Sequence, residues 1–164
     1  MHKINDIVVY KKDVCKIVEI RKNHLNNEDY YIMIPLADES LKLDVPVSNR
    51  CGFIRELITK EEALELIKKI PLIEPITNND KLLEQEYKSL LNNGSHEDLI
   101  KIIKTTYLRN EERKNNKKKI SDKDNYYFNQ AEKYLYTEFS VSLNMSFDET
   151  KEFVINKVKN ELTK

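Results

Sequence analysis

The sequence feature that most constrains the fold is a change in hydrophobic periodicity near residue 58. Before it, short β-branched and aromatic runs, several of them alternating apolar with polar residues, occupy positions 6–10, 14–20, 30–34 and 41–47. After it, apolar residues recur every three or four positions. Alternation is typical of strands and the longer period is typical of helices. The sequence therefore predicts an α+β chain with a β domain over residues 1–58 and a helical domain over residues 59–164.

The β domain is expected to be small and strongly curled. Polar breaks at residues 11–13 and 24–29 predict tight turns, in which Asn26 and Asn27 tolerate a positive φ. Pro35 and Pro46 fall at or inside predicted strands, which favours sheet edges or bulges because proline lacks the N–H that a central strand needs. Packing of such a sheet into a small barrel would stabilise it.

Helix start signals divide the rest of the chain into about five helices, enough for a compact bundle. Four segments place Thr or Ser three residues before an acidic residue and ahead of an apolar run, which is the pattern of a capping box; they are 59–62, 95–98, 121–124 and 146–149. A further helix over about residues 80–91 ends before Gly94, and Pro71 is expected to end the first helix.

Few residues suit catalysis or cofactor binding. The chain has only two cysteines, three histidines and two glycines, so it lacks both a metal-ligand spacing and a glycine-rich phosphate loop. Cys15 and Cys51 are expected to be small core residues. Paired acids such as Glu61 with Glu62 point about 100° apart on a helix and do not converge on a substrate. We expect no enzyme activity, no cofactor and no metal.

No apolar run approaches the roughly 20 residues that span a bilayer, so the expected location is the cytoplasm.

Charge is balanced overall but uneven along the chain. Twenty-eight Lys and Arg residues match 28 Asp and Glu residues, whereas residues 109–119 contain six cations and two acids. Cations at the end of a helix also suit the helix dipole, so a solvated helix end is one interpretation and phosphate contact is the other.

The order of the residues resembles the CarD family of bacterial transcription regulators. Matching segments in the β domain are residues 5–10, 14–20, 30–33, 44–47 and 54–59. In the helical domain they are residues 90–94, 99–103, 120–121 and 130–135, the first at the family's Ser-Gly-Asp turn. The resemblance covers nearly the whole chain, and the shared order of the segments carries it.

The resemblance implies a Tudor-like β domain that docks on the β subunit of bacterial RNA polymerase, and a helical domain that contacts promoter DNA. It implies stabilisation of the open promoter complex without any catalysed reaction. By matching, the residues near the polymerase are Arg21, Lys22, Lys42, Asp44 and Arg55. The predicted DNA contacts are Asp80, Lys81, Lys88, Arg113, Lys114, Lys117, Lys118, Lys119 and Lys123. DNA binding is expected to be weak, dominated by the phosphate backbone and sensitive to salt.

The chain departs from the family at one important position. Family members usually carry a Trp at the start of the second helix, wedged into the minor groove, whereas this chain has Asp80 there and contains no Trp. A carboxylate cannot stack on a base step and is repelled by phosphates. Either Tyr87 or the pair Tyr126 and Tyr127 substitutes for the Trp, or the protein contacts the DNA backbone only. Helical spacing favours a core position for all three tyrosines.

Three classes of protein remain open at this point. The first is a polymerase-docking regulator, and the second is a CarD-like adaptor that binds protein alone because the wedge is lost. The third is a small hydrolase or binding protein unrelated to transcription, for which only paired acids such as Glu111 and Glu112 are available. A two-domain monomer without membrane contact is the simplest expectation.

Overall fold

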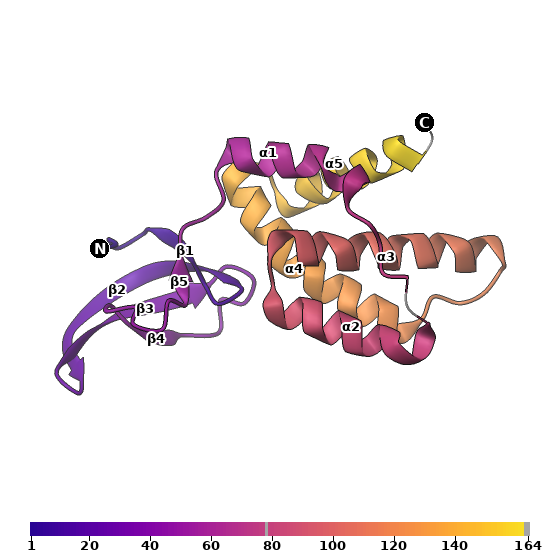
Figure 1. Cartoon of the computed structure of the whole chain (residues 1–164). Coiled ribbons are helices and arrows are strands. Elements are labelled where there is room, and N and C mark those ends of the chain that lie inside the picture. Colours follow the sequence, from indigo (N-terminus) through magenta and orange to yellow (C-terminus); the bar gives the residue numbers. More distant parts are fainter. Residues whose placement is uncertain (78, 163–164) are drawn as a thin grey trace. The chain divides into compact units, whose positions relative to one another are not determined.

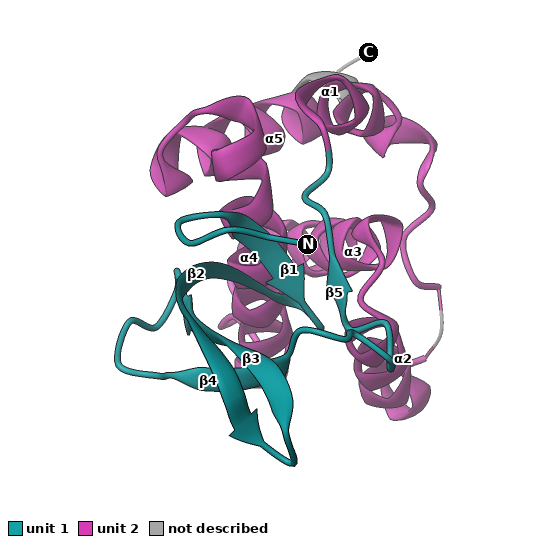
Figure 2. Ribbon diagram, turned by 90° about the vertical axis from the view of Figure 1, so that its left-hand side faces the viewer, with its two compact units in different colours: residues 1–58 teal, residues 59–164 magenta. Residues whose placement is uncertain are grey.

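The chain divides into two compact units, Met1–Ile58 and Thr59–Lys164, which are coloured separately in Figure 2. A computed structural model describes residues 1–77 and 79–162. In that part of the chain the first unit contains the strands and the second unit contains the helices (Figure 1). The predicted α+β class is therefore confirmed.

The first unit is a five-stranded antiparallel sheet with the strand order β4-β3-β2-β1-β5. The strands are β1 Ile7–Tyr10, β2 Asp13–Leu25, β3 Glu28–Pro35, β4 Leu43–Pro46 and β5 Ile54–Arg55. Pro46 lies on the edge strand β4 and Pro35 is the last residue of β3, where a missing N–H is tolerated. Register shifts interrupt the β2–β3 pairing twice and bend the sheet.

The turn between β2 and β3 is shorter than predicted. The strands continue through residues 24–25 and 28–29, and only Asn26 and Asn27 connect them, with φ of 51° and 61°. The positive φ predicted for both asparagines is confirmed. A two-residue turn of this kind matches the twist of the flanking strands, so the hairpin is longer than the polarity of the segment suggested.

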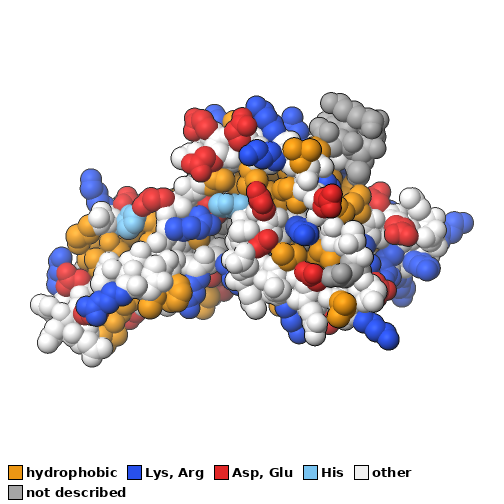
Figure 3. All heavy atoms as spheres, in the orientation of Figure 1, with side chains coloured by type: hydrophobic (Ala, Val, Ile, Leu, Met, Phe, Trp, Pro, Cys, Tyr) orange, Lys and Arg blue, Asp and Glu red, His pale blue; other side chains and the backbone are white. Residues whose placement is uncertain are grey.

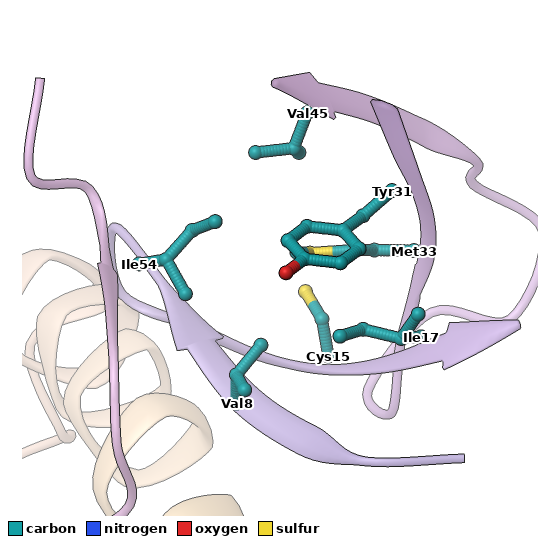
Figure 4. Packing of buried hydrophobic residues seen from close by; sticks show 7 residues of the cluster. All are labelled: Val8, Cys15, Ile17, Tyr31, Met33, Val45 and Ile54. Carbon is teal, nitrogen blue, oxygen red and sulfur yellow. The ribbon is translucent and has the colours of Figure 1, made fainter. Parts of the chain in front are cut away.

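The interior of the β unit is lined by side chains from all five strands. Val8, Ile17, Tyr31, Val45 and Ile54 belong to this cluster, together with Cys15 and Met33 (Figure 4). Val45 on one edge strand and the β5 isoleucine on the other face the same interior, so the sheet is curled as expected.

The two cysteines have different environments. Cys15 is fully buried, and burial raises the pKa of its thiol to about 12, which keeps it protonated and unreactive. The prediction for Cys51 was wrong, because this residue is exposed. It precedes Gly52, which has a φ of 69°, in the turn between β4 and β5. The neighbouring β residues made the segment look like part of a strand.

The second unit consists of five α-helices and one short 3-10 helix, η1, within the described residues (Figure 1). Their bounds are α1 Lys60–Lys68, η1 Ile70–Leu72, α2 Asp80–Asn93, α3 His96–Asn115, α4 Asp122–Leu143 and α5 Phe147–Leu162. The helix α3 is two turns longer than its apolar run indicated, so Arg113 and Lys114 lie in its last turn.

The predicted start signals are confirmed by side-chain caps. Thr59, Ser95 and Ser121 each accept a hydrogen bond from the backbone N–H three residues later, and Ser146 does so from Glu149. Gly94 ends α2 in the left-handed conformation, with a φ of 67°. These local bonds satisfy donors and acceptors that a helix end leaves without partners, which is why the sequence located the helices well.

A carboxylate is buried inside the helical unit. Glu132 of α4 is 4% exposed, and burial raises the pKa of its carboxyl while the nearby Lys151 partly opposes that effect. The Lys151 ammonium lies 3.5 Å from Oε1 and 3.4 Å from Oε2 of this residue. Among the described residues, Oε2 has no hydrogen-bond partner. The ionised form is therefore poorly compensated.

We expect Glu132→Gln to stabilise the helical unit at pH 7 and to have little effect near pH 4. Above the raised pKa the folded state carries a buried charge at a cost, whereas below the ordinary carboxyl pKa both folded and unfolded states are protonated and the cost disappears. We expect a gain of about 1 kcal/mol in the free energy of unfolding, which raises the midpoint of thermal unfolding by about 4 °C in a domain of this size. Thermal unfolding at the two pH values measures it. Glu152→Gln, on an exposed position of α5, is the control; an equal gain for the control would contradict the role of burial.

Candidate functional site

The predicted polymerase-binding residues fall mostly on one exposed face of the β unit. In the register of the sheet, Glu19 on β2 pairs with Ile32, which pairs with Asp44 on β4. Arg21 follows Glu19 by two residues and Lys42 precedes Asp44 by two, and alternate residues of a strand share a face. The structure therefore brings Arg21 of β2 and Asp44 of β4 together with Lys42, which immediately precedes β4.

Electrostatic interactions confirm that these side chains are close. The Nε of Arg21 donates to Oε1 of Glu19 over 2.9 Å, and Nη2 lies 3.3 Å from Oε2. This hydrogen bond is the main reason that the pKa of Glu19 is lowered, with Arg21 and Lys42 contributing through their charges. Arg21 in turn has a raised pKa because of Glu19, and Asp44 adds to that effect. His24 Nε2 lies 3.0 Å from Oδ2 of Asp44.

Two of the predicted polymerase contacts stand apart from this cluster. Lys22 lies near the β2–β3 turn, where its ammonium is 3.1 Å from Oδ2 of Asp29. Arg55 lies on β5, at the opposite edge of the sheet from β4, and its guanidinium donates to the backbone oxygen of Glu56. The sequence missed Glu19 and His24 as members of the cluster. Glu19 was detectable, because strand alternation puts it on the face of Arg21.

The predicted DNA contacts gather mainly where α3 ends and α4 begins. The segment from Arg113 to Lys119 contains five cations and no acid. Arg113 is partly exposed and donates to the backbone oxygen of Lys119, whereas the other cations are exposed; these are Lys114, Lys117, Lys118 and Lys119. Figure 3 shows blue side chains around this end of the helical unit, with red ones among them.

One acidic side chain of α2 pairs with two predicted DNA contacts outside this segment. Glu84 lies 3.6 Å from the ammonium of Lys123 and 3.9 Å from that of Lys88, both of which were predicted DNA contacts. Lys81 is exposed in the first turn of α2, one residue after Asp80. The cationic character of this surface therefore comes chiefly from the segment 113–119.

The tyrosines considered as substitutes for the missing Trp have different positions. Tyr87 is 0% and Tyr127 is 5% exposed, so the core interpretation holds for both. It is wrong for Tyr126, which is 56% exposed and packs edge-on against Tyr127 with ring centroids 5.0 Å apart. Adjacent helical residues point about 100° apart, so one of the pair lies inside and the other outside.

A buried ion-pair network, which the sequence did not predict, supports this end of the bundle. Asp124 of α4 is fully buried and accepts hydrogen bonds from the hydroxyl of Tyr87 at 3.0 Å and from Nε of Arg109 at 2.9 Å. Nη1 of Arg109 also lies 3.2 Å from Oδ1 of Asp80. Burial and the charge of Asp124 raise the pKa of Tyr87, so its hydroxyl stays protonated and donates. The network joins α2, α3 and α4.

Within residues 1–77 and 79–162, no group of three or more His, Cys, Asp or Glu side chains is arranged to hold a metal ion. None of the helices in that part of the chain combines the length and apolar character needed to cross a membrane. No protein-family model matches the chain, and no curated protein matches it either.

Proposed function

We propose that the chain is a bacterial transcription regulator that docks on the β subunit of RNA polymerase through its β unit and stabilises the open promoter complex through its helical unit. The observation that carries the proposal is the CarD-like order of segments, which continues from Met1–Ile58 into the helical unit. In this proposal the curled sheet is a Tudor-like domain. The protein acts in the cytoplasm by binding, with no catalysed step and no cofactor.

The edges of the sheet support the docking step. Among the described strands, β4 pairs with β3 alone, so its outer row of backbone groups faces no other strand. β5 pairs with β1 alone, but the N–H and the carbonyl of its Ile54 are already bonded to the side chain of Asn49, so β4 is the edge that suits docking. An extended segment of another protein can add to such an edge, and neighbouring side chains then set the specificity. Arg21, Lys42 and Asp44, near the β4 edge, would make the selective contacts. Lys22 and Arg55 would lie at the margins.

The acid-free segment from Arg113 to Lys119 supports the DNA contact. Fixed positive charges bind phosphates without reading the base sequence, and their binding weakens as salt rises. Lys81 would add to this surface. Lys88 and Lys123 would add to it where DNA phosphate replaces Glu84 as their partner. Docking on the polymerase raises the effective concentration of the helical unit near the promoter, so weak intrinsic affinity is sufficient.

A protein-only adaptor is the second candidate function, and the structure of α2 favours it. Asp80 occupies the position at which the family carries its wedge, and Tyr87 is buried. Tyr126 is the one tyrosine of the three with an exposed ring that could reach a base step. Both candidates predict capture of the polymerase β subunit, whereas only the first predicts a longer lifetime of the open complex.

The lifetime of the open complex tests the proposal. We expect the wild-type chain to lengthen it, and the double variant Arg21→Glu with Lys42→Glu to abolish this effect by reversing both charges on the docking face. Lys3→Glu is the control for the charge change, since this exposed residue precedes β1 and lies outside β2 and β4. Decay of the open complex after addition of a competitor gives the lifetime, and a pull-down with the β subunit measures docking separately.

The outcomes separate the candidates. Docking without an effect on lifetime would support the protein-only adaptor. Failure of the wild-type chain to bind polymerase would overturn both candidates. If the double variant lengthens the lifetime of the open complex as much as the wild-type chain does, the face of Arg21 is not the docking surface.

A further inference from the structure

A small polar hollow lies where the first turn of α2 meets the last turns of α3. It has a volume of about 180 Å³ and is lined by charged and polar side chains; these are Asp80, Arg109, Glu112, Arg113, Asn116 and Lys118. Three cations and two acids line it, so its net charge is only slightly positive. Displacement of an acid from the hollow would therefore make it attractive to an anion. The hollow is continuous with the basic segment that begins at Arg113.

The guanidinium of Arg109 is held in a fixed orientation at this hollow. Its Nε donates to the buried carboxylate of Asp124 over 2.9 Å, and Asp124 is itself anchored by the hydroxyl of Tyr87. Burial alone would lower the pKa of Arg109, but the hydrogen bond and charge of Asp124, together with the charges of Tyr87 and Asp80, outweigh it and the pKa is raised. A permanently charged, pre-oriented guanidinium whose other edge faces the hollow suits a phosphate, because its fork matches two phosphate oxygens.

That edge is now occupied by an exposed carboxylate. Oδ1 of Asp80 lies 3.2 Å from Nη1 of Arg109, yet the Asp80 side chain is 79% exposed whereas that of Arg109 is only 26% exposed. Asp80 is the first residue of α2, after the N-cap Asn79. An ion pair with so exposed a partner contributes little to stability and exchanges readily. An incoming anion can therefore replace Asp80 without disturbing the buried pair with Asp124.

We propose that this hollow is a phosphate-binding subsite, and that the Asp80 carboxylate now lies against Arg109 where the phosphate would bind. A backbone phosphate of DNA displaces the carboxylate and is bound by Arg109, Arg113 and Lys118. The subsite rests on the DNA contact proposed above and adds its location and its control. Asp80 limits affinity, so the free protein binds DNA weakly until polymerase brings the two together.

The test is the affinity of the full chain for a fluorescently labelled DNA duplex, measured by anisotropy at fixed salt. Asp80→Asn removes the competing charge and is expected to tighten binding about threefold, the effect of one unit charge about 6 Å from a phosphate in water. Asp148→Asn is the matched control. It makes the same charge change at an exposed position in the first turn of α5. This position follows the end of α4, about 30 Å from Asp124 in the first turn of that helix.

Lys118→Gln, made alone and together with Asp80→Asn, tests whether the effect arises at the hollow. Lys118 is an exposed member of the lining, so Lys118→Gln should reduce the gain from Asp80→Asn if both act on one bound phosphate. Equal gains for Asp80→Asn and Asp148→Asn would overturn the subsite and attribute the effect to net charge. No change with Asp80→Asn, together with weaker binding when residues 113–119 lose their charges, would overturn the subsite alone. No measurable DNA binding by any variant would overturn the DNA contact as well.

Discussion

Replacing Lys104 by Met is expected to lower the free energy of unfolding of the helical unit by about 3 kcal/mol. Lys104 is 8% exposed on α3, and its ammonium donates to three backbone oxygens after the end of α1. The oxygens belong to Ile70 at 2.9 Å, Pro71 at 3.3 Å and Ile73 at 2.8 Å. Met is similar in volume but cannot donate, so these buried and partly buried acceptors lose their common partner.

The same lysine fixes the path of the chain between α1 and α2. The next residue of α3, Thr105, accepts a hydrogen bond from the backbone N–H of Ile76 at 2.8 Å, so consecutive residues hold two parts of the connecting segment. Loss of the ammonium therefore affects the position of η1 as well as the hydrogen bonds. We expect a less cooperative transition in addition to a lower midpoint, because one segment can detach first.

Urea unfolding followed by circular dichroism measures this effect. Lys101→Met is the matched control, because Lys101 lies one turn earlier on α3 and is only partly buried. The control should change stability by less than about 0.5 kcal/mol, as surface substitutions usually do. Similar losses for the two variants would show that the carbonyl contacts of Lys104 contribute little.

The sequence predicted those parts of the structure that local interactions determine. The caps at Thr59, Ser95 and Ser121 are made by side chains three residues from their donors, so a short motif contains all the partners. The same holds for Asn26 and Asn27, whose positive φ closes the β2–β3 turn. Alternation then placed the face of Arg21 once the strands were known.

The parts that the sequence did not predict depend on partners far along the chain. Lys104 carries a charge that suggests exposure, and its acceptors lie 31–34 residues away. Asp124 fits the fourth position of a capping box, where an acid is normally solvated, but Tyr87 is 37 residues away and converts it into a buried anchor. Helical periodicity cannot separate Tyr126 from Tyr127 by itself, because only tertiary packing selects which neighbour faces the core.

Asp124→Asn is expected to destabilise the helical unit by about 3 kcal/mol, the lower end of the range for breaking a buried ion pair. The change removes the charge that compensates Arg109, whose side chain is 26% exposed, while preserving the volume at the site. The hydroxyl of Tyr87 also loses its charged acceptor. The side-chain contacts that join α2, α3 and α4 at this end of the bundle then weaken together.

Asp80→Asn provides the matched comparison, because it makes the same chemical change on the other partner of the same arginine. The Asp80 side chain is 79% exposed and that of Asp124 is 1% exposed, so solvent already stabilises the first carboxylate. Its loss should cost less than about 1 kcal/mol. Urea unfolding of the two variants gives the ratio directly. If both cost the same, burial does not govern this network, and the fixed orientation of Arg109 on which the phosphate subsite depends would have to come from elsewhere.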